Sequence, residues 1–343
     1  MAYSTINKPT DHFNTVLYTG NGTSQSITGI GFQPDWVWVK ARSSTAGHRL
    51  FDVVRGDYNL LESNSANAEA NNTNQISLDA DGFSTGSSVN TNSNSVTYAS
   101  WNWLASNTTA SNTDGSITST VSANTTSGFS IVTYTGNGTS ASFGHGLTSP
   151  KVVIIKDRSA ASTGWYFHTT AIDGSDDYLY LNQDVAKSDA GSGYSIGTSV
   201  YNLGGAGGVT NLNGNNYVAY CFQEIKGYSK FGIYTGNGSS DGPFIYTGFK
   251  PAFTLIKKSS ASGSWWEMVD NKRSPSNVMD NTLYSNVANT EFESSSYNRD
   301  FVSNGFKIRN TNSADNTSGE TYIYMAFAEA PLVGTNNIPA TAR

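Results

Sequence analysis

Three of the chain's seven tryptophans, Trp165, Trp265 and Trp266, follow loops rich in serine and glycine. The segments before them read SAASTG and SSASGS. A tryptophan ring on a loop can stack on the apolar face of a sugar, while small polar neighbours hydrogen-bond the sugar hydroxyls. We therefore predict that these three residues bind carbohydrate, with at least one of them at a domain edge. The alternative is a purely structural role.

An acidic turn, LDADGF at 78–83, could supply ligands to a calcium ion through Asp79 and Asp81. Because Ca²⁺ needs several oxygen ligands, this turn provides only a fraction of a site. The sequence therefore leaves two interpretations, a calcium site at these two residues or an ordinary turn. It implies no other cofactor.

The side chains that could perform catalysis do not form a known set. The chain contains neither G-x-S-x-G nor H-E-x-x-H, the motifs of many serine hydrolases and zinc proteases. A glycosidase needs two carboxylates at a set separation, and Glu267, Glu291 and Glu293 are the candidates. We expect no enzymatic activity. A polysaccharide depolymerase acting through Glu267 or Glu291 is the alternative.

One pentapeptide, YTGNG, stands at 18–22 and returns at 134–138 and 234–238. Asparagine and glycine tolerate positive φ, which tight turns require. The motif therefore predicts a turn at the end of a strand. The alternative is a loop that presents its asparagine to a sugar or to a partner chain. The asparagines concerned are Asn21, Asn137 and Asn237.

The residues after each pentapeptide also recur. A proline precedes an apolar run that ends in a lysine, as in WVWVK, KVVIIK and FTLIK. Short β-branched and aromatic runs are typical of strands, and apolar character on both faces indicates central strands. In the first copy Trp36 and Trp38 alternate, which places both rings on one face of a sheet, as predicted for core residues. The lysines are Lys40, Lys156 and Lys257.

The repeat period of about 100 residues is the size of a β-sandwich domain, and no sustained helical periodicity interrupts it. We therefore predict an all-β protein of three tandem antiparallel β-sandwich domains. The polar segment 106–128 is expected to be a linker or a surface ribbon. The second and third domains should pack closely and the first more loosely, unless Ile117 and Val121 pin the ribbon onto a sheet. The expected boundaries are 1–105, 129–226 and 227–330 for the domains and 331–343 for a tail.

Charge and cysteine content exclude several classes of partner. The net charge is −6 and no basic stripe is visible, so nucleic-acid binding is not expected. The apolar runs are strand-sized, which excludes a membrane helix. The N-terminal residues lack the apolar core of a signal peptide, and the single Cys221 cannot form an internal disulfide. We expect synthesis in a reducing host cytoplasm.

The three YTGNG copies, the GF-x-P segments and the tail AFAEAPLVGTNNIPATAR resemble a family of virion structural proteins of tailed, especially marine, bacteriophages. The resemblance covers essentially the whole chain. It implies lectin-type sandwiches of concanavalin A-like or jelly-roll architecture, and it brings no established catalytic residues. Fold likeness alone does not fix function.

From these observations we expect a non-enzymatic surface protein of the virion, either a capsid decoration or a tail or fibre component. Its expected partners are other virion proteins, further copies of itself in a homotrimer, and host-surface glycans. A purely architectural cement or fibre protein is the alternative. The expected location is the virion exterior.

Overall fold

The computed structural model describes residues 4–205, 209–334 and 339–341. Within these residues the chain is built of antiparallel strands, and its only helices are the short 3₁₀ turns η1 (Pro9–Asp11) and η2 (Ser295–Tyr297). The prediction of an all-β protein is confirmed. The strands form three sets, which we call unit 1 (13–103), unit 2 (110–222) and unit 3 (229–331).

Unit 1 pairs a four-stranded sheet with a three-stranded sheet and adds a short two-stranded ribbon. The large sheet has the order β1 (Phe13–Thr19), β9 (Thr97–Trp103), β3 (Trp36–Ala41) and β4 (Arg49–Asp52). The small sheet has the order β2 (Gln25–Thr28), β8 (Gly82–Thr85) and β7 (Ile76–Asp79), and the ribbon is β5 (Asn59–Leu60) with β6 (Ala70–Asn71).

Unit 2 repeats this plan with more strands in the large sheet. The large sheet has the order β10 (Ala110–Asn112), β11 (Ser119–Asn124), β12 (Phe129–Thr135), β20 (Asn216–Phe222), β14 (Val152–Asp157), β15 (Trp165–Thr169), β16 (Asp177–Tyr180) and β17 (Ser188–Asp189). The small sheet has the order β13 (Ser142–Gly144), β19 (Val200–Leu203) and β18 (Tyr194–Ile196).

Unit 3 follows the same order of strands. The large sheet runs β21 (Ser229–Thr235), β29 (Thr321–Pro331), β23 (Phe249–Lys258), β24 (Glu267–Asp270), β25 (Asn281–Tyr284) and β26 (Phe292–Glu293). The small sheet runs β22 (Phe244–Tyr246), β28 (Gly305–Ile308) and β27 (Arg299–Val302). In every unit the strand before the YTGNG turn therefore pairs with the last strand of the large sheet along the chain, which in turn pairs with the strand that carries the repeated lysine.

The central strands are buried on both faces, as their apolar sequences require. In β3, Val37 and Val39 belong to the core between the two sheets of unit 1, whereas Trp36 and Trp38 belong to a second core that all three units share. Because side chains alternate between the two faces of a strand, β3 contributes residues to both cores. The equivalent positions Val152 and Phe253 also lie in the shared core.

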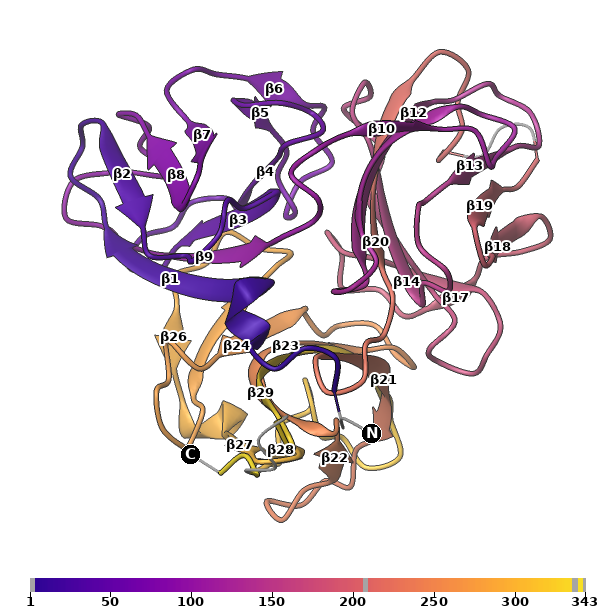
Figure 1. The fold of residues 1–343 in the computed structure, drawn as a ribbon. Helices are drawn as coiled ribbons and strands as arrows, with labels where there is room; N and C mark the ends of the chain where they lie inside the picture. Colours follow the sequence, from indigo (N-terminus) through magenta and orange to yellow (C-terminus); the bar gives the residue numbers. More distant parts are fainter. Residues whose placement is uncertain (1–3, 206–208, 335–338, 342–343) are drawn as a thin grey trace.

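The three large sheets face one another across this shared core, so that the units form three lobes around a common centre (Figure 1). Packing is tight, because the gap at the centre has a volume of only about 10 Å³. Trp36 illustrates the arrangement, since its ring stacks on Tyr220 of unit 2 at 4.3 Å and lies 4.5 Å from Trp103 of its own unit. Phe253 of unit 3 also packs here, with its ring centroid 6.2 Å from that of Trp103.

The segment 106–128 does not separate two domains. It contributes β10 and β11 to the large sheet of unit 2, and Ile117 and Val121 are buried against that unit. Unit 2 therefore begins before residue 129. The exception stated for the first domain applies, because Ile117 and Val121 pin the segment onto a sheet. The first domain is therefore not loosely tethered, and its tryptophans fill the shared core. The expected tail begins at the end of β29, and its residues 335–338 and 342–343 lie outside the described residues.

Candidate functional site

The YTGNG segments form three equivalent turns, each closed by a second asparagine from later in its unit. In unit 1 the Oδ1 atom of Asn21 accepts a hydrogen bond from the amide of Thr23, at 2.8 Å. The amide of Asn21 donates to Oδ1 of Asn92, at 2.9 Å. The same pairs recur as Asn137 with Asn211 and Asn237 with Asn316.

The other letters of the motif also have structural roles. Gly22 has φ +73°, and a Cβ on Gly20 would lie 2.2 Å from the carbonyl oxygen of Ser93. The ring of Tyr18 stacks on Tyr98 at 5.0 Å, and the pairs in the other units have the same spacing. The tyrosine, the glycines and the asparagine of the motif therefore have roles within the fold, as the turn interpretation predicts, while the three asparagines are also exposed to solvent.

Two of the three tryptophans predicted to bind sugar are buried where units meet. Trp165 is 0% exposed and its Nε1 donates to the carbonyl of Glu62 in unit 1, at 2.8 Å. Trp266 is 1% exposed and its Nε1 donates to the carbonyl of Tyr180 in unit 2, at 2.9 Å. Because neither ring offers a face to solvent, the predicted sugar stacking at these two residues is wrong.

Unit 1 completes this set with His48, whose Nε2 lies 2.7 Å from the carbonyl oxygen of Tyr284 in unit 3. Strand register places His48 at the position of Trp165 and Trp266. Burial lowers the pKa of His48 well below its usual value, so the ring is neutral at pH 7. In each unit an aromatic nitrogen thus contacts the main chain of a neighbouring unit. Unit 1 contacts unit 3, unit 2 contacts unit 1, and unit 3 contacts unit 2.

The three repeated lysines are buried at the same boundaries. Each ammonium group donates to a main-chain carbonyl one residue further on, and burial lowers each pKa to about 8. Lys156 also donates to Ala66 of unit 1 at 3.2 Å, and Lys257 donates to Asp184 of unit 2 at 3.3 Å. All three lysines are covered by protein, and Lys156 and Lys257 join neighbouring units.

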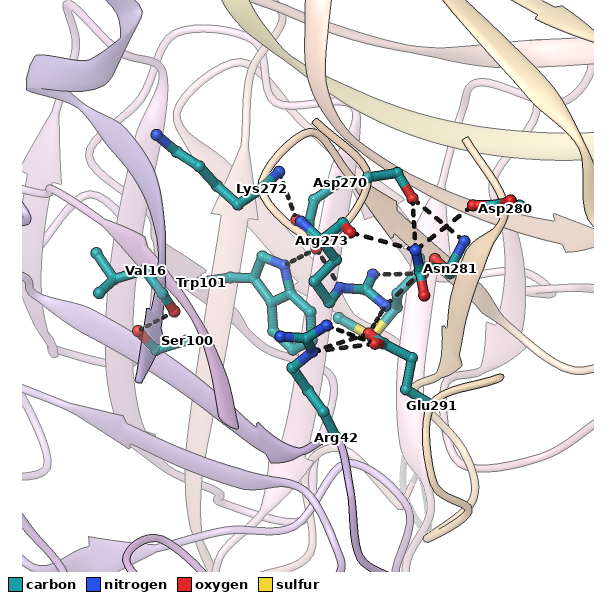
Figure 2. A network of polar contacts seen from close by, with 12 residues as sticks. Val16, Arg42, Ser100, Trp101, Asp270, Lys272, Arg273, Asp280, Asn281 and Glu291 are labelled. Carbon is teal, nitrogen blue, oxygen red and sulfur yellow. Dashed lines mark hydrogen bonds and ion pairs between the residues drawn. The ribbon is translucent and has the colours of Figure 1, made fainter. Parts of the chain in front are cut away.

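The glutamates considered for catalysis are engaged in ion pairs. Glu291 accepts hydrogen bonds from Arg42 of unit 1 and Arg273 of unit 3, at 2.7 and 2.9 Å, and Figure 2 shows both guanidinium groups directed at its carboxylate. Glu267 is buried against Arg299. Glu293 is exposed. The carboxylates of Glu267 and Glu291 therefore do not form an open pair across a substrate site.

A matching ion triad joins units 1 and 2, whereas the boundary of units 2 and 3 has none among the described residues. Glu69 binds Arg55 at 2.9 Å and Arg158 of unit 2 at 2.7 Å. At the boundary of units 2 and 3 the corresponding contact runs from the amide of Lys187 to the carbonyl of Ser259, at 2.8 Å. Lys187 instead pairs with aspartates of its own unit.

The acidic turn predicted to hold calcium is closed by internal hydrogen bonds. Asp81 accepts from the amides of Gly29 and Gly31, and Asp79 accepts from the hydroxyl of Ser84. Among the described residues, no group of three or more histidine, cysteine, aspartate or glutamate side chains could hold a metal ion. The geometry of Asp79 and Asp81 is that of a turn.

Trp265 is the one tryptophan of the three that reaches solvent, with 38% of its surface exposed. Its ring makes an edge contact with Tyr284 at 4.8 Å. Strand register places Gly47 and Gly164 at the equivalent positions of units 1 and 2. Because two units fold with glycine there, the fold does not require this ring. The prediction that Trp265 binds carbohydrate stays a prediction.

A second pair of exposed aromatic residues lies on the solvent face of β22. Phe244 is 47% exposed and Tyr246 is 52% exposed. Register places Ser26 and Thr28 at these positions in unit 1. Unit 2 has the small residues Ser142 and Gly144 there. Unit 3 therefore presents two aromatic rings where its sibling units present small residues.

Tyr246 lines a surface groove with a volume of about 490 Å³. The groove lies between β22 and the segment that connects units 2 and 3, and its floor carries hydroxyl, ammonium and carboxylate groups. Glu224 on one wall pairs with Lys151 at 3.0 Å. An aromatic face beside convergent polar groups is the composition of a saccharide site. The other lining residues are Lys226, Gly227, Ser229, Lys230, Thr247 and Gly248.

Sequence reasoning missed Phe244 and Tyr246, although a signal was present. The segments after YTGNG read SITGIGF, SFGHGL and FIYTGF, and alignment of the three copies shows aromatic residues at polar positions of the last one. Tryptophans drew attention because of their type. A residue that differs from its equivalents in the other two units is the better guide, because residues that the fold itself needs recur in all three units.

The family model described as "Domain of unknown function (DUF7483)" matches residues 8–331. This span contains all three units. No curated protein and no solved structure matches the chain. Among the residues that the structure describes, no helix has the length and hydrophobicity of a membrane span.

Proposed function

Because the chain belongs to the DUF7483 family, whose model spans the three units together, we propose that the whole three-lobed body acts as one non-enzymatic protein on the surface of a bacteriophage virion. It serves as a capsid decoration or as a tail or fibre component. Support comes from the sequence resemblance and from a body that is held together without disulfides, since its single cysteine, Cys221, is buried and free. The shared core joins the three units into one body.

We further propose that this protein holds host-surface glycans in the groove beside Tyr246. The observation that carries this proposal is the exposure of Phe244 and Tyr246 where the sibling units have serine, threonine and glycine. Rings that the other two units replace with small residues are not required by the shared fold, and exposed aromatic rings are common in binding sites. Binding at one groove is weak, and many copies on a particle supply avidity.

The test is a glycan array probed with the full chain displayed on a multivalent carrier. The variants Tyr246→Thr and Phe244→Ser introduce the residues of unit 1 and should leave the fold unchanged. We expect each to lower apparent affinity about tenfold, equivalent to about 1.4 kcal/mol. Val89→Ala is the matched control, because Val89 is 69% exposed on unit 1. Equal binding by all variants, or no binding by the multivalent wild type, would contradict the glycan role.

The architectural alternative is favoured by the ion triads at Glu69 and Glu291, which bind the units into one body. Under this alternative, removal of the protein lowers the thermal stability of particles and leaves host adsorption unchanged. Assembly of further copies into a homotrimer is part of the proposal. Light scattering of the purified protein tests it, because a single chain has a mass of 36.6 kDa.

A further inference from the structure

His168 of unit 2 is buried, and among the residues that the structure describes neither of its ring nitrogens has a hydrogen-bond partner. The hydroxyl of Tyr201, whose ring lies 5.3 Å away, is also buried without a partner. Buried polar atoms are paired in the great majority of cases, so a cluster of unpaired ones needs an explanation. A site that binds a ligand in the functional state is one such explanation.

Tyrosine rings surround His168 on the side that reaches solvent. The ring of Tyr166 stacks over it at 5.9 Å, the ring of Tyr194 stacks at 5.7 Å, and the ring of Tyr178 lies at 5.8 Å. All three tyrosines are half-buried, as is Tyr180, whose hydroxyl lies 3.0 Å from that of Tyr166. We call Tyr166, Tyr178, Tyr180 and Tyr194 the tyrosine cluster.

Units 1 and 3 fill the equivalent space in a different way. Phe51 and Val269 occupy the position of His168. At the position of Tyr166, unit 1 has Arg49, which pairs with Glu62, and unit 3 has Glu267, which is buried against Arg299. The fold therefore tolerates an apolar residue in place of His168, and neither the imidazole nor the tyrosine cluster is a requirement of the shared architecture.

The chemistry of this place is uncharged. Burial lowers the pKa of His168 to about 3, so at pH 7 the imidazole has one N–H donor and one nitrogen acceptor. A sugar hydroxyl is both a donor and an acceptor and satisfies either nitrogen. The apolar face of a sugar ring stacks on tyrosine. Access requires displacement of one flanking tyrosine, and each of these rings is only partly buried.

We propose that the tyrosine cluster over His168 is a second binding site, for one ring of an uncharged saccharide. It lies in unit 2 and is separate from the groove beside Tyr246 in unit 3. The two proposals share a ligand class and use different residues, so either can fail alone. The ring nitrogens of His168 hydrogen-bond the bound saccharide, so this residue determines specificity. When no saccharide is bound, the buried nitrogens lower the stability of the folded protein.

The test uses the four histidines of the chain as NMR reporters. The imidazole signals of His168 should shift when the full-length protein is titrated with N-acetylglucosamine or glucose. The signals of His12, His48 and His145 should not move. Tyr166→Ala should weaken the shift about tenfold, and Tyr246→Thr should leave it unchanged, which separates this site from the groove.

His168→Phe is the second arm, because unit 1 folds with Phe51 at this position. We expect this variant to unfold at a higher temperature than the wild type and to lose saccharide-dependent shifts of the tyrosine-cluster signals. The proposal is overturned if His168 signals stay fixed at saturating sugar, if His168→Phe binds as the wild type does, or if the ring shifts equally with uncharged aromatic compounds such as adenosine.

Discussion

Arg42 of unit 1 and Glu291 of unit 3 are 249 residues apart in the chain, yet Nη2 of the arginine lies 2.7 Å from Oε1 of the glutamate. Arg273 holds the same carboxylate from the other side at 2.9 Å (Figure 2), and Asp270 then links Arg273 to the indole of Trp101 in unit 1. The boundary between the first and last units has no covalent connection. This network and the shared core hold it closed.

Removal of the carboxylate at this boundary should destabilise the whole chain. We expect Glu291→Gln to lower the free energy of unfolding by about 2–4 kcal/mol, because it leaves a buried guanidinium with fewer partners. Urea unfolding followed by tryptophan fluorescence measures the effect. Glu293→Gln, at an exposed position close by, is the control and should have no measurable effect. Equal stability of both variants would show that the pair contributes nothing.

The shared core predicts that the three units unfold together. Scanning calorimetry of the wild type should show one transition, since exposure of any inner sheet face exposes the others. Trp103→Ala should lower the unfolding free energy by about 3–5 kcal/mol and shift that single transition as a whole. Separate transitions for individual units would contradict a common core.

Stability should depend on pH through Glu267. Burial raises the pKa of this carboxyl from 4.5 to about 8, so between these values the folded protein holds a proton that the unfolded chain releases. The unfolding free energy therefore falls as pH rises through this window. Glu267→Gln should flatten the dependence between pH 5 and 8. A variant with the same pH profile as the wild type would exclude this residue as the source.

The first glycine of the repeated turn should not tolerate a side chain. A Cβ on Gly20 would lie 2.2 Å from the carbonyl oxygen of Ser93, so Gly20→Ala should cost about 1–3 kcal/mol as the backbone shifts. Gly205→Ala is the control, because no atom of the described residues lies within 4 Å of its Cβ. Thermal unfolding of the two variants compares them, and equal melting temperatures would mean that the turn adapts without cost.

The role of Trp265 can be tested by replacing it with glycine, the residue at the equivalent positions of units 1 and 2. Trp265→Gly introduces the residue of units 1 and 2, and we expect a change in unfolding free energy of less than about 1 kcal/mol. If the ring stacks on a sugar, glycan binding should fall in this variant while the fold is kept. Unchanged binding would assign all carbohydrate recognition to other residues.

Repeats and strands could be predicted from the sequence because they depend on local patterns. Turn chemistry at Asn21 and alternation at Trp36 and Trp38 are examples. The roles of Trp165 and Trp266 could not be predicted, because a tryptophan after a polar loop reads the same whether a sugar or a neighbouring unit covers it. Whether the first domain is held loosely or tightly could not be decided from the sequence for a related reason. Periodicity shows that a strand has two apolar faces and does not show what packs against the second one.

Contact between the first and last units has a consequence for how this protein can evolve. An open solenoid grows by adding copies at either end. Here the inner faces of three large sheets already fill the centre, so a fourth copy would find no room there. The geometry therefore limits the shared core to three units. Surface residues of each unit can still vary without disturbing that core. Unit 3 differs from the other two in this way, through its exposed rings at Phe244 and Tyr246.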